Sequence, residues 1–453
     1  MKYVQALLSA LVMNVATILS LTIPARTSTH YLYASRGQVS VIDKVTAVTC
    51  IGYRLAAALI CLSMALLLAP DIEASEVAPV QLGTRPFYLV DQLNPGVLKE
   101  ELSRCAAETK QFRRTDFSIG HRGAALHFPE HTRESYIAAA GMGAGIVECD
   151  VTFTKDRQLV CRHDQCDLHT TTNILTTELA GKCSVPPQFD ARGTLRNGKL
   201  IRCCTSDLTL SEFKSLEGTK ARSDPAASTG QVYPVSGTLM THAESIDLFR
   251  RLGVGMAPEL KAPRVSMPFG GDYTRQDFAQ QMIGEYVAAG VDSRRVWPQS
   301  FSYQDVLYWI QNTPTFGRQA VFLDSRDRID VKAPGEVAAL VPSMEQLVRD
   351  GVRFIAPPMQ MLLAVDNADR IVPSAYARAA RSAGLEIMGW TTERSGRLRP
   401  GGGGYYYSTV KEVIRNDGDI LTVMDALAQD VGIIGLFSDW PATTTFYANC
   451  KLK

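Results

Sequence analysis

The chain has 453 residues, of which 46% are hydrophobic, so it is long and apolar enough for one large domain or two smaller ones with a sizeable core. Its formal net charge is +1, and no basic stripe runs along it. The near-zero net charge and the lack of a basic stripe argue against binding to polyanions through overall charge. We therefore expect neither a nucleic acid nor an anionic membrane surface as a partner.

The N-terminal segment, residues 1–74, contains two apolar stretches. Val4–Ile23 has 20 residues, enough for a transmembrane helix, unless it is an upstream extension from a mis-assigned start. Leu55–Ala69 follows Arg54 and precedes small and polar residues, which is typical of a secretory signal. We therefore predict export, with this segment removed or acting as the only membrane anchor. A lead-in over residues 75–114 and the main domain over residues 115–453 follow.

From residue 115 onward, short apolar runs alternate with amphipathic segments. Strands are predicted at Phe117–Gly120, Gly145–Phe153, Gly255–Leu260, Arg295–Gln299, Ala320–Leu323, Phe354–Ala356, Glu386–Trp390 and Ile433–Phe437. Helices are predicted at Arg133–Met142, Ala243–Leu252, Asp277–Ala289, Tyr303–Gln311, Gly335–Asp350, Ser374–Ala383 and Ile420–Asp430. Thr241 and Glu244 form a capping box for one of these helices. Eight strands with helices between them predict an α/β fold, a (β/α)8 TIM barrel, and the alternative is an open doubly wound sheet.

Two segments interrupt this alternation. Residues 164–240 hold no clear strand–helix unit but contain four cysteines, and loops this long are usually functional or disordered. We expect a cysteine-containing insertion after the second strand, cross-linked by disulfides and lying over the barrel mouth. After the seventh strand, Gly401–Gly404 precede Tyr405–Tyr407, which predicts either a surface linker or part of the lip of a substrate site.

The cysteines support export. Eight of the ten lie beyond residue 75, and an even number in an exported chain suggests disulfides, although the pairing cannot be read from the sequence. A zinc site is disfavoured, because no CxxC spacing occurs. Cys149 lies between two carboxylates on a strand, so we expect it to face away from them as a free thiol in the core.

Chemically active side chains follow the predicted strands at the ends where a barrel places its active site. His121 and Arg122 come directly after the first strand, and Glu148 and Asp150 point to one side of the second strand. Two unpaired buried carboxylates would be costly, whereas a divalent cation with hard oxygen ligands, Ca²⁺ or Mg²⁺, removes that cost. Glu259 ends the third strand and could supply a third carboxylate.

A second histidine should reach the same mouth of the barrel. His163 follows Leu159–Cys161, which we expect to form a hairpin with the second strand. Two histidines beside a metal suit general acid and base roles near neutral pH, and Arg122 offers a planar set of donors for phosphoryl oxygens. Each residue alone has an ordinary structural interpretation, such as a cap or a solvated strand face. We interpret His127, His131 and His169 as structural or rim residues.

Taken together, the motifs resemble those of the glycerophosphodiester phosphodiesterase family, in an exported branch that carries an insertion. The matching segments are His121-Arg122-Gly123, Pro129-Glu130-His131-Thr132, Glu148-Cys149-Asp150-Val151, Thr154-Lys155-Asp156, His163-Asp164, Glu259-Leu260-Lys261, Gln299-Ser300-Phe301, Trp390-Thr391 and Gly435 to Pro441. The resemblance covers roughly residues 115–445. The chain departs from the family pattern at His131, where the family usually has Asn, and mildly at Ser438-Asp439-Trp440, where it usually has Thr-Asp-Tyr.

The resemblance implies a barrel that hydrolyses glycerophosphodiesters, small water-soluble molecules, to an alcohol and sn-glycerol 3-phosphate. It implies that Glu148, Asp150 and Glu259 bind one divalent metal ion and that His121 and His163 are the acid/base pair. It also implies a set of residues that contact the substrate, namely Arg122, Glu130, Lys261, Gln299 and Trp390. Arg122 and Lys261 would hold the phosphate, and Glu130 would orient Arg122 or the glycerol hydroxyls.

Two other functions remain open at this point. A barrel of the phospholipase D or phosphoinositide-specific phospholipase C type would act on intact lipids and would need an apolar rim. Loose candidates for such a rim are Phe87, Tyr88, Phe269, Tyr405–Tyr407 and Trp440. A binding protein with a decayed site is disfavoured, because every motif residue is present.

Overall fold

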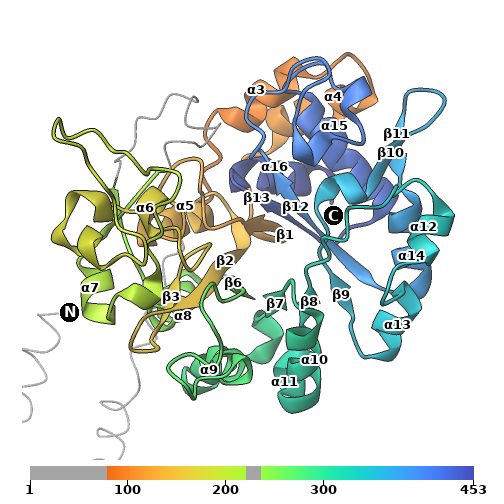
Figure 1. Cartoon of the computed structure of the whole chain (residues 1–453). Helices are drawn as coiled ribbons and strands as arrows, with labels where there is room; N and C mark the ends of the chain where they lie inside the picture. Colours follow the sequence, from red (N-terminus) through yellow and green to blue (C-terminus); the bar gives the residue numbers. More distant parts are fainter. Residues whose placement is uncertain (1–78, 221–235, 453) are drawn as a thin grey trace, which may run out of the picture. The chain divides into compact units, whose positions relative to one another are not determined.

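Eight parallel strands close into a barrel in the computed structural model, which describes residues 79–220 and 236–452 (Figure 1). The strands are β1 (Thr115–Gly120), β2 (Ala144–Phe153), β6 (Gly255–Leu260), β7 (Gln299–Ser300), β8 (Val321–Phe322), β9 (Phe354–Ile355), β12 (Glu386–Thr392) and β13 (Gly435–Ser438). Each pairs with the next, and β1 pairs with both β2 and β13. The predicted barrel is confirmed, and an open doubly wound sheet is excluded because this ring of strands has no edge.

The helices that cover the barrel follow the predicted order. They include α5 (Arg133–Gly141), α8 (His242–Leu252), α9 (Arg275–Ala288), α10 (Tyr303–Asn312), α14 (Ala375–Ala383) and α16 (Pro441–Lys451). Helix α8 begins at the predicted capping box, in which Thr241 and Glu244 cap each other's backbone N–H groups. Two earlier helices, α3 (Arg85–Gln92) and α4 (Val97–Glu108), pack against α16.

Three predicted elements differ from the structure. The helix predicted over Gly335–Asp350 is two helices, α12 (Pro334–Ala338) and α13 (Met344–Arg349). Pro342 lies between them and interrupts a continuous helix, because proline has no backbone N–H to donate and its ring clashes with the preceding turn. The strand predicted at Arg295–Gln299 is confined to β7, since a 3₁₀ turn occupies Ser293–Arg295 and Pro298 cannot donate to the ladder. The helix predicted over Ile420–Asp430 is α15 (Asp419–Asp425) followed by a π-helical turn, η9 (Ala426–Val431).

The insertion between β3 (Leu159–Cys161) and α8 is built from short pieces with a core of their own. Its elements are α6 (Leu168–Thr171), η1 (Ile174–Thr176), η2 (Glu178–Lys182), η3 (Thr205–Asp207), α7 (Leu210–Lys214), β4 (Glu217–Thr219) and β5 (Ser236–Thr238). Leu168, Ile174 and Phe213 are buried in this separate core. Disulfides Cys166–Cys204 and Cys183–Cys203 cross-link it, as expected for a segment with so little regular structure.

The expectation that Cys149 is a free thiol is wrong, because Cys149 forms a disulfide with Cys161. The predicted hairpin explains the pairing. Strand β3 pairs antiparallel with β2, and Val151 lies opposite Cys161. Cys149 points to the same side as Val151, so the two cysteines are diagonal neighbours on one face, with Cα atoms 5.4 Å apart. A fourth disulfide, Cys105–Cys450, joins α4 to α16.

The predicted apolar stretches Val4–Ile23 and Leu55–Ala69 lie outside the described residues. Within the described part of the chain, no helix combines the length and the apolar character that crossing a membrane requires.

Candidate active site

The polar residues singled out in the sequence converge at the carboxyl ends of the barrel strands. His121 and Arg122 follow β1, Glu148 and Asp150 lie on β2, and Glu259 lies on β6. All five are between 1% and 8% exposed, which is far below the exposure of ordinary surface charges. A small hollow of about 50 Å³ brings together four of them with six further side chains, namely His163, Phe301, Leu323, Trp390, Tyr406 and Phe437. The strands therefore direct the predicted residues into one place.

Three buried carboxylates form the floor of the site. Oxygen atoms of Glu148, Asp150 and Glu259 lie within 4.8 Å of one another. Burial and the two neighbouring carboxylates raise the pKa of Glu148 well above its ordinary value. Burial also raises the pKa of Glu259, to about 7, although the Lys261 ammonium at 2.6 Å opposes this. Three buried carboxylates this close together can all stay ionised only when a cation binds to them.

The hydrogen bonds of this group point to the same need. Glu148 accepts from the Arg122 backbone N–H at 2.9 Å and from the Gln299 side-chain amide at 2.8 Å. Asp150 Oδ2 accepts from His131, but Asp150 Oδ1 is buried and has no hydrogen-bond partner among the described residues. A buried carboxylate oxygen without a hydrogen-bond partner, on a residue grouped with two further carboxylates, fits the binding of one divalent cation that prefers oxygen ligands.

His121 is held in one orientation by Asp439, which follows β13. The His121 Nδ1–H donates to Asp439 Oδ2 at 3.1 Å, which leaves Nε2 facing Glu148, 3.8 Å from Oε2. Burial raises the pKa of Asp439, but His121 and the Arg394 guanidinium outweigh this and lower it to about 2. Burial also lowers the pKa of His121. The result is an ionised aspartate behind a neutral imidazole, which is the arrangement that orients a catalytic histidine.

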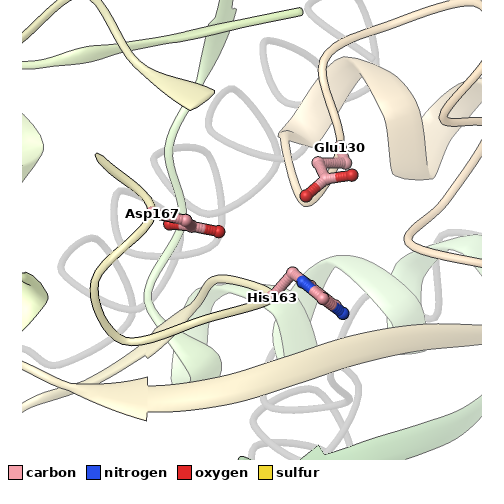
Figure 2. Close-up of side chains that lie close together, drawn as sticks. All are labelled: Glu130, His163 and Asp167. Carbon is pink, nitrogen blue, oxygen red and sulfur yellow. The ribbon is translucent and has the colours of Figure 1, made fainter. Parts of the chain in front are cut away.

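His163 lies on the other side of the site, on the loop after β3. Figure 2 shows His163 close to the side chains of Glu130 and Asp167, and one polar atom from each of the three lies within 4.8 Å of the other two. Burial, Arg122 and Lys261 keep the pKa of His163 well below its ordinary value. Burial raises the pKa of Asp167 to about 6. Two neutral histidines, His121 and His163, thus face the carboxylate floor from different elements.

Two cations stand beside the carboxylates. Arg122 Nη1 donates to Glu130 Oε2 at 2.9 Å, so the structure pairs Glu130 with Arg122. Burial opposes the charge of Arg122, but the surrounding carboxylates, Glu130 first, raise its pKa above the ordinary value. Lys261 pairs with Glu259. Both side chains keep their charge at the position where an anionic substrate would meet the floor.

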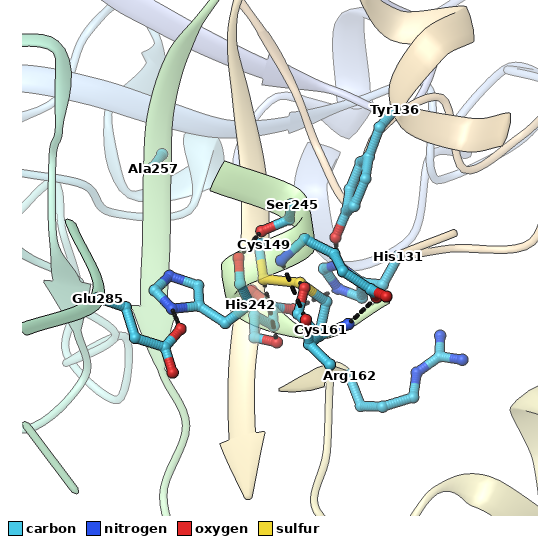
Figure 3. The surroundings of a disulfide bond; sticks show 12 residues. His131, Tyr136, Cys149, Cys161, Arg162, His242, Ser245, Ala257 and Glu285 are labelled. Carbon is cyan, nitrogen blue, oxygen red and sulfur yellow. Dashed lines mark hydrogen bonds and ion pairs between the residues drawn. A yellow bond between two sulfur atoms is a disulfide. The ribbon is translucent and has the colours of Figure 1, made fainter. Parts of the chain in front are cut away.

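His131, which we interpreted as a structural or rim residue, is fully buried and holds the site from behind. Its Nε2–H donates to Asp150 at 2.9 Å, and its Nδ1 is hydrogen-bonded to the Tyr136 hydroxyl at 3.0 Å. Figure 3 shows this pair beside the Cys149–Cys161 disulfide. His131 has φ 57°, a left-handed conformation that Asn and His adopt more readily than most residues. This explains why His stands where the family usually has Asn, since both tolerate the backbone and both donate an N–H.

Aromatic side chains close the remaining side. Trp390 donates through its indole N–H to the Ala356 carbonyl at 2.8 Å, and its ring centre lies 5.9 Å from those of Phe301 and of Tyr406. Tyr406 lines the hollow, so the segment after Gly401–Gly404 borders the site and is not a distant linker. Asp439 and Arg394 were not singled out in the sequence as site residues. Asp439 appeared there only within a family motif, and Arg394 gave no signal.

Comparisons with known proteins point to one family. The model of the glycerophosphoryl diester phosphodiesterase family matches residues 121–443. A protein from Arthroderma benhamiae described as an extracellular protein is 43% identical over 245 residues, which are 53% of this chain and 95% of that protein. A glycerophosphodiester phosphodiesterase from Arabidopsis thaliana is 23% identical over 387 residues, which are 81% of this chain and 96% of that protein.

Two solved structures match much of the chain at low identity. A glycerophosphodiester phosphodiesterase from Agrobacterium tumefaciens has 18% identity and a TM-score of 0.41, over 72% of this chain and 98% of that chain. An Oleispira antarctica phosphodiesterase in complex with sn-glycerol-3-phosphate has 16% identity and a TM-score of 0.43, over 72% of this chain and 94% of that chain. Since the family model spans the site from His121 to beyond Asp439, the chain belongs to the glycerophosphoryl diester phosphodiesterase family.

Proposed function

We propose that this protein is a metal-dependent phosphoric diester hydrolase that cleaves glycerophosphodiesters to an alcohol and sn-glycerol 3-phosphate. The observation that carries the proposal is the group of buried carboxylates Glu148, Asp150 and Glu259, within 4.8 Å of one another, with the histidines His121 and His163 beside them. This combination supports metal-assisted acid–base chemistry on an anionic ester.

The three carboxylates would hold one ion, Ca²⁺ or Mg²⁺, because both prefer oxygen ligands. When bound, the ion would polarise a phosphoryl oxygen and screen the charge of the diester. Arg122 and Lys261 would bind the other phosphoryl oxygens, since both keep their charge in the site. Glu130 holds the Arg122 guanidinium in place through its ion pair. Gln299, which donates to Glu148, and Trp390, which lines the hollow, would complete the substrate contacts.

The two histidines would share the proton transfers. His121 suits the role of base, because Asp439 fixes the proton on Nδ1 and stabilises the imidazolium that forms when Nε2 accepts a second proton. His163 would act in its protonated, imidazolium form, which the nearby Glu130 carboxylate favours, and would transfer that proton to the oxygen of the alcohol that leaves. General acid–base transfer of this kind typically accelerates a reaction by about 10²–10⁴-fold.

The alternative, cleavage of intact lipids, would need an exposed apolar rim. Most of the candidate aromatics do not provide one: Phe87, Phe269 and Trp440 pack against the core, and Tyr407 is buried. The exposed Tyr405 donates its hydroxyl to Asp327. These contacts favour a water-soluble substrate.

We also propose that the protein is exported. Four disulfides tie the described part together, and disulfides persist in oxidising compartments. The Arthroderma benhamiae relative is described as extracellular. The experiment that tests the function is incubation of the purified protein with glycerophosphocholine plus Ca²⁺, Mg²⁺ or a chelator, with release of sn-glycerol 3-phosphate as the readout.

Release that requires one of the ions would support both the reaction and the metal. Full release in excess chelator would contradict the metal assignment alone. No release by a folded sample, together with turnover of phospholipid vesicles, would contradict the proposed substrate and favour the lipase alternative.

A further inference from the structure

A second, larger chamber opens beside the hollow at His121. Its volume is about 250 Å³, compared with about 50 Å³ for the hollow itself. The two share the side chains of His163, Glu259 and Phe301, so they meet over the carboxylate floor. A diester bound at this floor would place one alcohol on each side of the phosphorus. The small hollow suits the constant three-carbon glycerol, and the larger chamber suits the alcohol that varies.

The charges of the larger chamber disfavour a cationic alcohol. Phe301 is the one aromatic ring besides His163 among the residues that line it, and the Lys261 ammonium lies 5.9 Å from the centre of that ring. A quaternary ammonium group such as that of choline binds best over an aromatic face. Here the ring already faces a fixed positive charge, which would repel choline.

The mouth of the chamber offers hydrogen bonds in place of an aromatic cage. Arg264 contacts Asp164 through Nε at 2.8 Å and through Nη2 at 2.7 Å, with 59% of the arginine side chain exposed. An exposed guanidinium next to a carboxylate presents donors and an acceptor side by side. Vicinal hydroxyl groups of a polyol both accept and donate, and so match this pair.

The insertion fixes the position of Arg264. Arg202 of the insertion donates to the Arg264 carbonyl oxygen. The Arg264 backbone N–H donates to the Gln165 side chain at 2.6 Å, and the Gln165 carbonyl accepts from Thr205 at 2.7 Å. The Cys166–Cys204 disulfide joins the residues next to Gln165 and Thr205. The cross-linked insertion therefore supports the outer wall of the chamber.

We infer that this chamber receives the leaving alcohol and selects uncharged polyols, such as glycerol or inositol, over choline, with Arg264 as a specificity-determining residue. The inference rests on the proposed function. It is tested by measuring kcat/KM of the purified full chain for glycerophosphoinositol, glycerophosphoglycerol and glycerophosphocholine. Arg264→Ala is compared with the control Arg251→Ala, which removes an equally exposed arginine that pairs with Asp247 on a helix away from the chamber.

The wild-type protein should prefer the two polyol esters by at least about tenfold, in the range that a few pocket contacts provide. Arg264→Ala should lower kcat/KM for the polyol esters more than for the choline ester, so that the ratio falls by about tenfold. Arg251→Ala should leave the ratio unchanged. Equal or better turnover of glycerophosphocholine by the wild type, or an equal loss for all three esters in Arg264→Ala, would overturn the inference alone. Failure to hydrolyse any of the three would overturn the proposed function and the inference with it.

Discussion

Removal of the Cys149–Cys161 disulfide should lower kcat far more than removal of the Cys105–Cys450 disulfide does. Cys149 lies between Glu148 and Asp150 in the sequence, and Cys161 precedes His163 by two residues. Strand β3 has only three residues, so the disulfide is a large part of what positions His163 relative to the carboxylates. In the double variant Cys149→Ala/Cys161→Ala, a displacement of about 1 Å at His163 would lower kcat by about 10²-fold.

The stability cost can be worked from the loop that the disulfide closes. The two cysteines are 12 residues apart, which corresponds to about 3 kcal/mol of chain entropy in the unfolded state. Cys105 and Cys450 are 345 residues apart, which corresponds to about 6 kcal/mol, or less because the other disulfides shorten that loop. Cys105→Ala/Cys450→Ala is therefore the matched control.

The assay is denaturant unfolding together with steady-state kinetics on a glycerophosphodiester for both double variants. The control should lose more stability and keep its kcat, whereas the Cys149/Cys161 variant should lose less stability and most of its kcat. If the Cys149/Cys161 variant keeps the wild-type kcat, or if kcat in the two variants falls in proportion to lost stability, the disulfide has no positioning role.

Three further predictions concern single side chains. His163→Ala should lower kcat by about 10²–10⁴-fold with an unchanged circular dichroism spectrum, and an active variant would remove His163 from the mechanism. His131→Asn should keep metal affinity, because Asn tolerates the left-handed backbone and can donate a hydrogen bond to Asp150. His131→Ala should weaken metal binding, measured by calorimetry, by about 10–100-fold. Equal affinities in the two variants would show that His131 does not support Asp150. Asp439→Asn should reduce the free energy of unfolding at pH 7 by about 2 kcal/mol, since the pKa of Asp439 is lowered from 3.8 to about 2 in the folded protein. A carboxylate with a lowered pKa stabilises the fold above its unfolded pKa, so the gap to the wild type should close as pH falls from 4 to 2, and a constant gap would refute the shift.

The barrel could be predicted from the sequence because each strand–helix unit carries its own signal. Local signals also placed β3 in a hairpin and the caps of α8 correctly. The pairing of Cys149 with Cys161 depends on the register of a three-residue strand, which hydrophobic alternation cannot specify. The break at Pro342 was visible in the sequence, and the continuous helix predicted there ignored it.

The candidate site shows the same division between local and distant signals. His121, Glu148, Asp150 and Glu259 stand at strand ends that the alternation pattern locates. Asp439 reaches His121 only because β13 pairs with β1, more than 300 residues away in sequence, when the barrel closes. The support that His131 gives to Asp150 likewise depends on a loop conformation, and no spacing rule encodes it.

The Cys105–Cys450 disulfide closes the part of the chain from residue 105 to residue 450 into a covalent ring. The covalent ring runs from α4 to α16 and encloses all eight barrel strands. A protease that cuts one loop within the ring opens it without releasing a fragment, so the two new ends stay attached and can remain docked. Nicked protein would run as a single species on a gel until it is reduced. Proteases are common outside the cell, and cleaved proteins are not resynthesised there. A chain closed by this disulfide would stay in one piece after a cut that would split a chain without it into two fragments.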